Sequence, residues 1–118
     1  KQVLADIPEA KLKIIGTGPL YSVIKRKISE MGLETAVQLV GPVAHTKLPD
    51  WYREARVLLF PSYTESFGIV QVEAMACGIP VIAYANEGSR EVLAKYPDCL
   101  VKIGDVENLS KKLRQVLS

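Results

Sequence analysis

The sequence predicts an α/β fold in which about five parallel strands lie between two layers of helices. Short apolar segments alternate along the chain with longer segments whose apolar residues recur at helical spacing. The short segments are apolar on both faces, as in a parallel sheet that helices cover on both sides. No internal repeat, linker or low-complexity stretch interrupts this order, so we predict a single domain over residues 1–118.

The predicted strands cover residues 11–15, 36–40, 57–60, 81–84 and 100–103. Glycine or proline closes the first three of them, which is typical of a strand that ends in a turn. Right-handed crossovers bring the carboxyl ends of parallel strands to one edge of a sheet, where α/β proteins bind ligands. The turns at residues 16–19, 41–45, 61–68 and 84–88 are therefore the predicted binding edge.

The predicted helices lie between these strands and after the last one. They cover residues 20–31, 48–55, 69–76 and 89–94 and a final helix that follows Asp105, while residues 1–5 are predicted to end a further helix. Gly32 and Gly78 follow two of these segments, as expected for residues that terminate a helix. Asp105 is a predicted N-cap, because its carboxylate can accept from the first free backbone N–H groups.

Composition excludes several classes of protein. The apolar fraction is 48% and the charged fraction 24%, which excludes a disordered chain. A net charge of +2 gives no reason to expect a nucleic acid or an anionic membrane as partner. The apolar runs are far shorter than the roughly 20 residues that span a bilayer, and no signal peptide is visible. Cys77, Cys99 and His45 are too few for common zinc sites and indicate a reducing, cytoplasmic location.

The turn at residues 61–68 and the helix after it carry the strongest functional signal. Glu65 and Ser66 precede a helix start that includes Gly68. Free backbone N–H groups and the positive end of the helix dipole make such a position an anion site, which glycine opens to close approach. A second interpretation is that Glu65 only caps the helix or offsets its dipole.

Gln71 and Glu73 are the only polar residues of this predicted helix, so we expect it to be largely buried. A buried carboxylate is costly unless it is paired or meets a polar ligand. Glu73 is therefore predicted to face the crevice and to accept hydrogen bonds from vicinal hydroxyls. The alternative is a partly exposed Glu73, or one that forms a salt bridge with an arginine.

Residues 65–73 form a Glu-x7-Glu motif that continues through residues 74–82 as Ala-Met-Ala-Cys-Gly-Ile-Pro-Val-Ile. This string closely resembles the nucleotide-sugar-binding half of the retaining glycosyltransferases of family four, whose GT-B fold contains two Rossmann-like domains. Residues 12–19, 40–43, 58–62 and 86–91 resemble other strands and loops of the same family. The resemblance spans nearly all of the chain and implies half of a GT-B architecture.

The resemblance implies a role for each matching residue. Glu73 would hold the ribose hydroxyls of a UDP-, GDP- or ADP-linked sugar, and Glu65 would be the catalytic residue, near the reacting carbon of the sugar. The other implied donor-binding residues are Ser66, Phe67, Gly68, Ile69, Val70, Gly16, Gly18, Gly41 and Val43. The implied reaction transfers a glycosyl group to a hydroxyl with retention, and it requires neither a cofactor nor a metal.

The sequence also departs from the family. The arginine and lysine that hold the diphosphate, and the N-terminal acceptor domain, belong to a part of the family that precedes the match, and Lys1, Lys11 and Lys13 do not correspond to them. Glu87 stands where the family has a loop glycine. We therefore expect no turnover by the 118-residue chain alone, and a position of the full-length protein at a membrane surface stays open.

Other functions have less support. A nucleotide-sugar epimerase, a glycogen-type synthase fragment and a non-catalytic α/β interaction module remain alternatives. Pro19 and Tyr21 interrupt any dinucleotide fingerprint, and Ser62 lacks the glycine-flanked elbow of a hydrolase. Trp51 and Tyr52 are predicted core residues of their helix.

Overall fold

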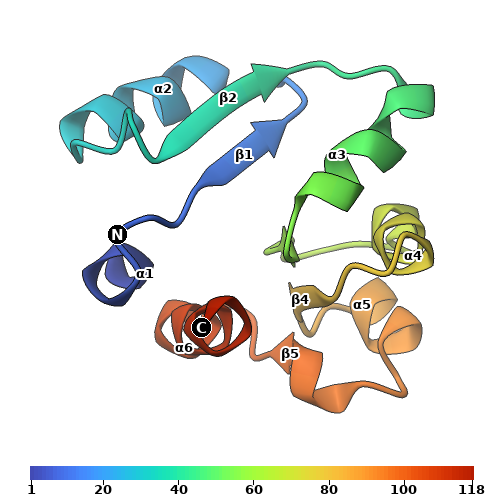
Figure 1. The fold of residues 1–118 in the computed structure, drawn as a ribbon. Coiled ribbons are helices and arrows are strands. Elements are labelled where there is room, and N and C mark those ends of the chain that lie inside the picture. The colour runs from blue at the N-terminus through green and yellow to red at the C-terminus, as the bar shows by residue number, and fades with distance from the viewer. The chain divides into compact units, whose positions relative to one another are not determined.

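The computed structural model describes residues 1–118. Strands and helices alternate as predicted (Figure 1). They are α1 (Gln2–Asp6), β1 (Leu12–Ile15), α2 (Tyr21–Glu30), β2 (Val37–Gly41), η1 (His45–Lys47), α3 (Leu48–Glu54), β3 (Leu58–Phe60), α4 (Ile69–Ala76), β4 (Val81–Tyr84), α5 (Glu87–Val92), η2 (Pro97–Cys99), β5 (Leu100–Val101) and α6 (Val106–Leu117). Here η marks a short 3-10 helix.

All strand pairs are parallel, which confirms the predicted α/β class. The strands pair in two sheets with the orders β1-β2 and β3-β4-β5. The chain forms two compact units, residues 1–48 and residues 49–118, and each sheet lies within one of them. We call them the N-terminal unit and the C-terminal unit.

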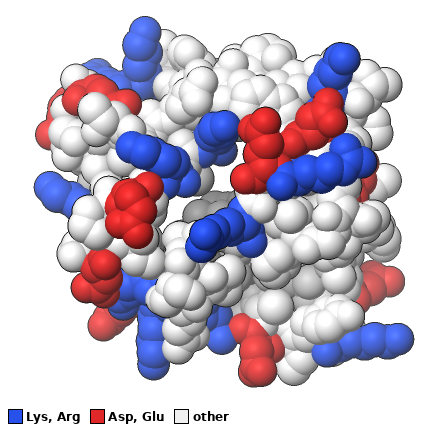
Figure 2. Space-filling model, viewed as in Figure 1, with Lys and Arg blue, Asp and Glu red and all other residues white.

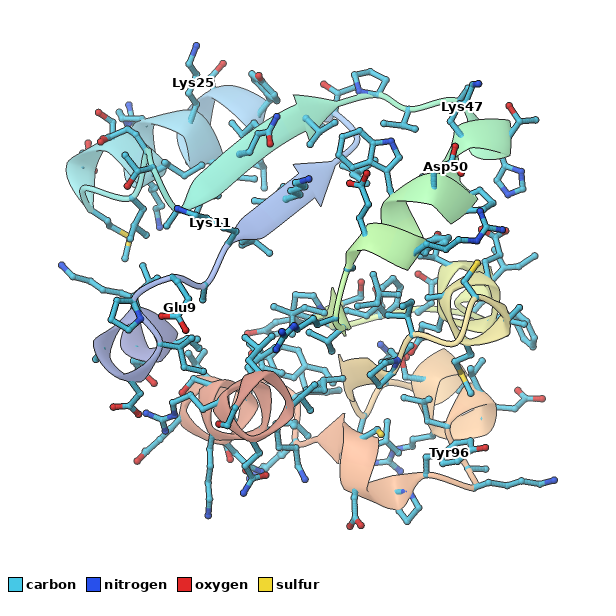
Figure 3. All side chains as sticks on the ribbon, viewed as in Figure 1. Glu9, Lys11, Lys25, Lys47, Asp50 and Tyr96 are labelled. Carbon is cyan, nitrogen blue, oxygen red and sulfur yellow. The ribbon has the colours of Figure 1, made fainter.

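The N-terminal unit contains the two-stranded sheet and α2, and none of its side chains is fully buried. Leu12 lies opposite Val37, and the Gly16 N–H donates to the Gly41 carbonyl at 2.8 Å where the ladder ends. Lys11 lies at the other end of β1, as Figure 3 shows, and its Nζ donates to the Thr35 carbonyl at 2.9 Å. This lysine is therefore held at the amino end of the sheet, away from the predicted binding edge.

The C-terminal unit has three layers. β4 is the central strand, and all four of its residues are buried. Figure 1 shows α6 on one face of the sheet and α4 and α5 on the other. Ile82, Tyr84 and Val101 pack with Leu109 of α6 into a hydrophobic core. Burying a large apolar side chain contributes about 1.5–3 kcal/mol, so this unit has the better-buried framework for a site.

Helix α4 has the bounds that the sequence predicts, but its burial differs. Gly68 and Gly78 flank it, and both have positive φ angles, of 79° and 78°. The side chains of Ile69 and Val72 are 62% and 40% exposed, whereas Gln71 is completely buried. The prediction of a largely buried helix was therefore wrong, because one apolar face of α4 points to solvent.

Charged side chains of both signs are interspersed over the face of the molecule in Figure 2. None of the helices has the length and apolar character that a bilayer span requires.

Candidate functional site

A cleft of about 680 Å³ opens at the carboxyl edge of the three-stranded sheet. Loops after β3 and β4, the start of α5 and a residue that follows β5 form its walls, so the predicted turns at 61–68 and 84–88 meet there. The lining residues are Tyr63, Thr64, Glu65, Ser66, Ala85, Asn86, Glu87, Arg90 and Ile103. The cleft therefore brings together acidic, basic and hydroxyl side chains.

Glu65 and Ser66 lie in this cleft because Gly88, in the first turn of α5, holds their backbone. The Gly88 N–H donates to the Glu65 carbonyl at 2.9 Å. A Cβ atom at position 88 would lie 2.7 Å from that carbonyl oxygen and 2.9 Å from the Phe67 nitrogen, so only glycine fits here without a shift. Gly88 thus fixes the position of the predicted catalytic glutamate.

Asn86 provides a second link between the two loops, one that the sequence analysis missed. Its Nδ2 donates to the Ser62 carbonyl at 2.8 Å, and its Oδ1 accepts from the Ser89 N–H at 2.7 Å. The second bond caps α5. An asparagine just before a helix is a known N-cap signal, and it indicates that α5 begins at Glu87, two residues before the predicted start.

The N-terminus of α4 has no side-chain cap. Gly68 is the N-cap residue in the left-handed conformation, and the N–H groups of Ile69 and Val70 precede any intrahelical acceptor. The side chains of Phe67 and Ile69 are 48% and 62% exposed around this helix end. This helix end thus has no side-chain cap and places the positive end of the helix dipole at residues 68–70.

Glu73 lies on α4, outside the set of residues that line the cleft. It is half-buried, and its Oε2 accepts a hydrogen bond from the Tyr52 hydroxyl at 3.4 Å. Tyr52 is 6% exposed, which confirms it as a core residue. Burial and the Glu73 carboxylate raise the pKa of Tyr52, so its hydroxyl remains a neutral donor.

Gln71 is the polar residue that α4 buries. Neither its Nε2 nor its Oε1 has a hydrogen-bond partner, and the same holds for the buried Ser89 Oγ. The Gln71 amide packs against Gly68, where an added Cβ would come within 2.2 Å of Nε2. Helical periodicity alone could not show which polar residue of α4 faces inward, because its apolar residues surround the helix.

The N-terminal unit contains the other residues that the resemblance implies. Gly16 and Gly18 follow β1, and Gly41 and Val43 lie at the end of β2, so all four are at the carboxyl end of the two-stranded sheet. Gly16 and Gly41 have φ angles of 109° and 86°, and no atom lies within 4 Å of a Cβ added at Gly16, Gly18 or Gly41. These turns are therefore open.

Known proteins resemble this chain in sequence. The family model for glycosyl transferases group 1 matches residues 1–118. D-inositol 3-phosphate glycosyltransferase 2 of Catenulispora acidiphila is 48% identical over 93 residues, which cover 70% of this chain and 21% of that protein. An exopolysaccharide phosphotransferase of Streptomyces coelicolor is 33% identical over 98% of this chain and 12% of its own length. The chain thus spans about a fifth or less of these relatives.

Solved structures agree with the fold. Sucrose-phosphate synthase of Thermosynechococcus elongatus has a TM-score of 0.86 and 33% identity, covering 98% of this chain and 31% of that chain. HepE of Anabaena in complex with UDP has a TM-score of 0.81 and 25% identity, covering 99% of this chain and 35% of that chain. These neighbours confirm the predicted Rossmann-like half of a GT-B architecture. The chain belongs to the glycosyl transferases group 1.

Proposed function

We propose that this chain is the donor-binding part of a retaining glycosyltransferase, which moves a hexosyl group from a nucleotide-diphosphate sugar to a hydroxyl acceptor. One observation carries the proposal. The uncapped N-terminus of α4 follows directly on the loop that presents Glu65 and Ser66 in the cleft. Backbone donors for a diphosphate and a carboxylate for sugar hydroxyls thus occur within one loop and helix start.

The proposed roles follow the chemistry of each group. The N–H groups at Phe67, Gly68, Ile69 and Val70 bind the diphosphate or the sugar, and Glu65 accepts from sugar hydroxyls beside the reacting carbon. The free N–H groups and the helix dipole offset the charge of the leaving diphosphate, so no metal is required.

Glu73 is proposed to hold the ribose hydroxyls. The support for this role is the place of Glu73 in the Glu-x7-Glu motif, eight residues after Glu65. Gly16 and Gly18 are proposed to line the donor crevice, and Gly41 and Val43 to lie beside the base.

The names of the relatives support the finer points. The neighbour crystallised with UDP favours UDP over GDP or ADP as the nucleotide. The relatives named as D-inositol 3-phosphate glycosyltransferases favour a hydroxylated acceptor. We further propose that an N-terminal acceptor domain completes the enzyme, that the enzyme acts in the cytoplasm and that the 118-residue chain alone does not turn over.

Titration of the 118-residue chain with UDP, GDP, ADP and their sugars, followed by NMR, tests donor binding. We expect UDP to bind weakly and Glu73→Ala to lower its affinity about tenfold or more, as for loss of a strong polar contact. Glu107→Ala, an exposed glutamate of α6, is the control and should leave the affinity unchanged. Binding of no nucleotide would favour the non-catalytic module instead.

A second assay tests the expected lack of turnover. The purified chain is incubated with a radiolabelled UDP-sugar and a panel of hydroxyl acceptors, and labelled product is counted. Transfer of the sugar by this chain alone would contradict the proposal that further domains are needed.

A further inference from the structure

The cleft contains one cationic side chain, Arg90 of α5. Its Nε donates to the Ala85 carbonyl at 2.9 Å, which fixes the orientation of the planar guanidinium. No carboxylate pairs with it, so its two terminal nitrogens retain four N–H donors for a ligand. An arginine held in this way loses less side-chain entropy when it binds an anion.

The same cleft is lined by two acidic residues, Glu65 and Glu87, and by two hydroxyl residues, Thr64 and Ser66. Carboxylates accept hydrogen bonds from ligand hydroxyls, whereas a guanidinium donates to phosphate or carboxylate oxygens. Glu65 and Glu87 would repel a simple anion, so Arg90 alone does not suit inorganic phosphate. The combination fits a polyol or sugar that also carries one anionic group.

The proposed position of the donor diphosphate differs from that of this arginine. The diphosphate's proposed position is the N-terminus of α4, and neither the residues that begin α4 nor Glu73 line the cleft. Arg90 lies on the α5 wall, beside Glu65 and Ser66. Since Glu65 is proposed to contact the donor sugar, Arg90 is placed to meet that sugar or the molecule that receives it.

We propose that Arg90 binds an anionic group, a phosphate or a carboxylate, on the transferred sugar or on the acceptor. The inference rests on the proposed function and assigns a substrate class to the same cleft. Glu65 and Glu87 accept hydroxyls of the ring while the Arg90 guanidinium takes two anionic oxygens in parallel. A bidentate pair of this kind adds geometric selectivity to the charge attraction.

The test compares matched ligands by NMR titration of the 118-residue chain. UDP-glucuronate against UDP-glucose probes an anionic donor sugar, and glucose 6-phosphate against glucose probes an anionic acceptor. We expect the anionic member of one pair to bind about tenfold or more tightly, and Arg90→Gln to abolish that preference. Arg53→Gln is the control, because Arg53 is exposed on α3 and outside the cleft.

The pair that shows the preference identifies which substrate carries the anionic group. Equal binding within both pairs would overturn the proposal, as would an Arg90→Gln chain that loses UDP affinity to the same extent as its affinity for the anionic probe. Loss of UDP binding in the unaltered chain counts against the proposed function instead. In that case, the ratio of the affinities for glucose 6-phosphate and for glucose still tests the Arg90 subsite.

Discussion

Gly88 is a residue whose side-chain hydrogen the structure does not allow to be replaced without a shift of the backbone around it. A Cβ at this position would come 2.7 Å from the Glu65 carbonyl oxygen, and the backbone atoms it meets cannot rotate away as a flexible side chain would. We expect Gly88→Ala to lower the free energy of unfolding by about 1–3 kcal/mol, as overpacking commonly does. Chemical denaturation followed by Trp51 fluorescence measures this, because Trp51 belongs to the C-terminal unit.

Gly18→Ala is the matched control for this prediction. No atom lies within 4 Å of a Cβ added at Gly18, and its φ angle is not in the left-handed region. We expect a change of about 0.5 kcal/mol or less. Equal losses for both variants would show that the approach of the loop to Gly88 is not what constrains this position.

Glu73 illustrates what the sequence can establish about a single residue. Its side chain was expected to need a ligand because the helix looked buried, but α4 exposes Ile69 and Val72 and buries Gln71 instead. Glu73 has the Tyr52 hydroxyl as a partner within its own unit. The role of Glu73 in ribose binding therefore depends on the motif and on the titration experiment, since the burial argument fails.

At the scale of elements, Asn86 both caps α5 and ties that helix to the loop after β3. Asp105 provides a matched cap without the tie, because its Oδ1 accepts from the Asn108 N–H at 3.0 Å at the start of α6. Replacing either cap with alanine should cost about 1 kcal/mol. Asn86→Ala should cost about 0.5–1.5 kcal/mol more, because the Ser62 carbonyl also loses its donor.

Urea unfolding of the two variants measures the difference. Asn86→Ala should also accelerate amide hydrogen exchange in the loop that carries Glu65, whereas Asp105→Ala should not. The same stability for both variants, with unchanged exchange, would show that the bond to Ser62 does not hold the loop.

Element bounds were predictable where glycine or a strong pattern marks both ends. α4 was predicted without error because Gly68 and Gly78 flank a continuous apolar run. α5 starts two residues earlier than predicted, because the Asn86 side chain accepts from the Ser89 N–H and so begins the helix at Glu87. β5 is two residues long, half of the predicted segment, because it pairs only along the end of β4.

At the scale of the whole molecule, the sequence could not show how the strands pair. Parallel strands with apolar faces indicate a covered sheet, but the pattern within each strand does not identify its neighbour. β1 pairs with β2 within residues 1–48, and β3, β4 and β5 pair within residues 49–118. The predicted binding edge brought the turns of Glu65 and Asn86 together, but it did not include Arg90, which lies inside α5.

Stability should fall at high pH. Burial is the largest cause that raises the pKa of Tyr52, and the neighbouring Glu73 raises it further. Burial is also the largest cause for Tyr84, whose pKa Tyr63 and Asp105 raise further. Both therefore keep their protons in the folded chain above the unfolded value of about 10. Their contribution is complete below pH of about 10 and is lost as pH rises through the folded-state pKa values.

Urea midpoints measured at intervals from pH 8 upward, past a pH of about 11, test this expectation. Tyr52→Phe should flatten the alkaline decline, because it removes one of the two raised groups. Tyr96→Phe is the control, since Tyr96 is 53% exposed and its side chain lies at the surface (Figure 3). A decline that Tyr52→Phe leaves unchanged would show that this tyrosine does not cause it.

The contact of Gly88 with residues 65–67 has a consequence for protein engineering and for divergence within the family. Because the backbone of residues 65–67 lies against Gly88, neither segment can change its backbone conformation or gain a side chain at this contact without a matching change in the other. A library that randomises the Glu65 segment while Gly88 stays fixed samples only the variants that already fit beneath it. New sugar preferences should therefore emerge most readily when both segments are diversified together, and the two positions should covary across natural relatives.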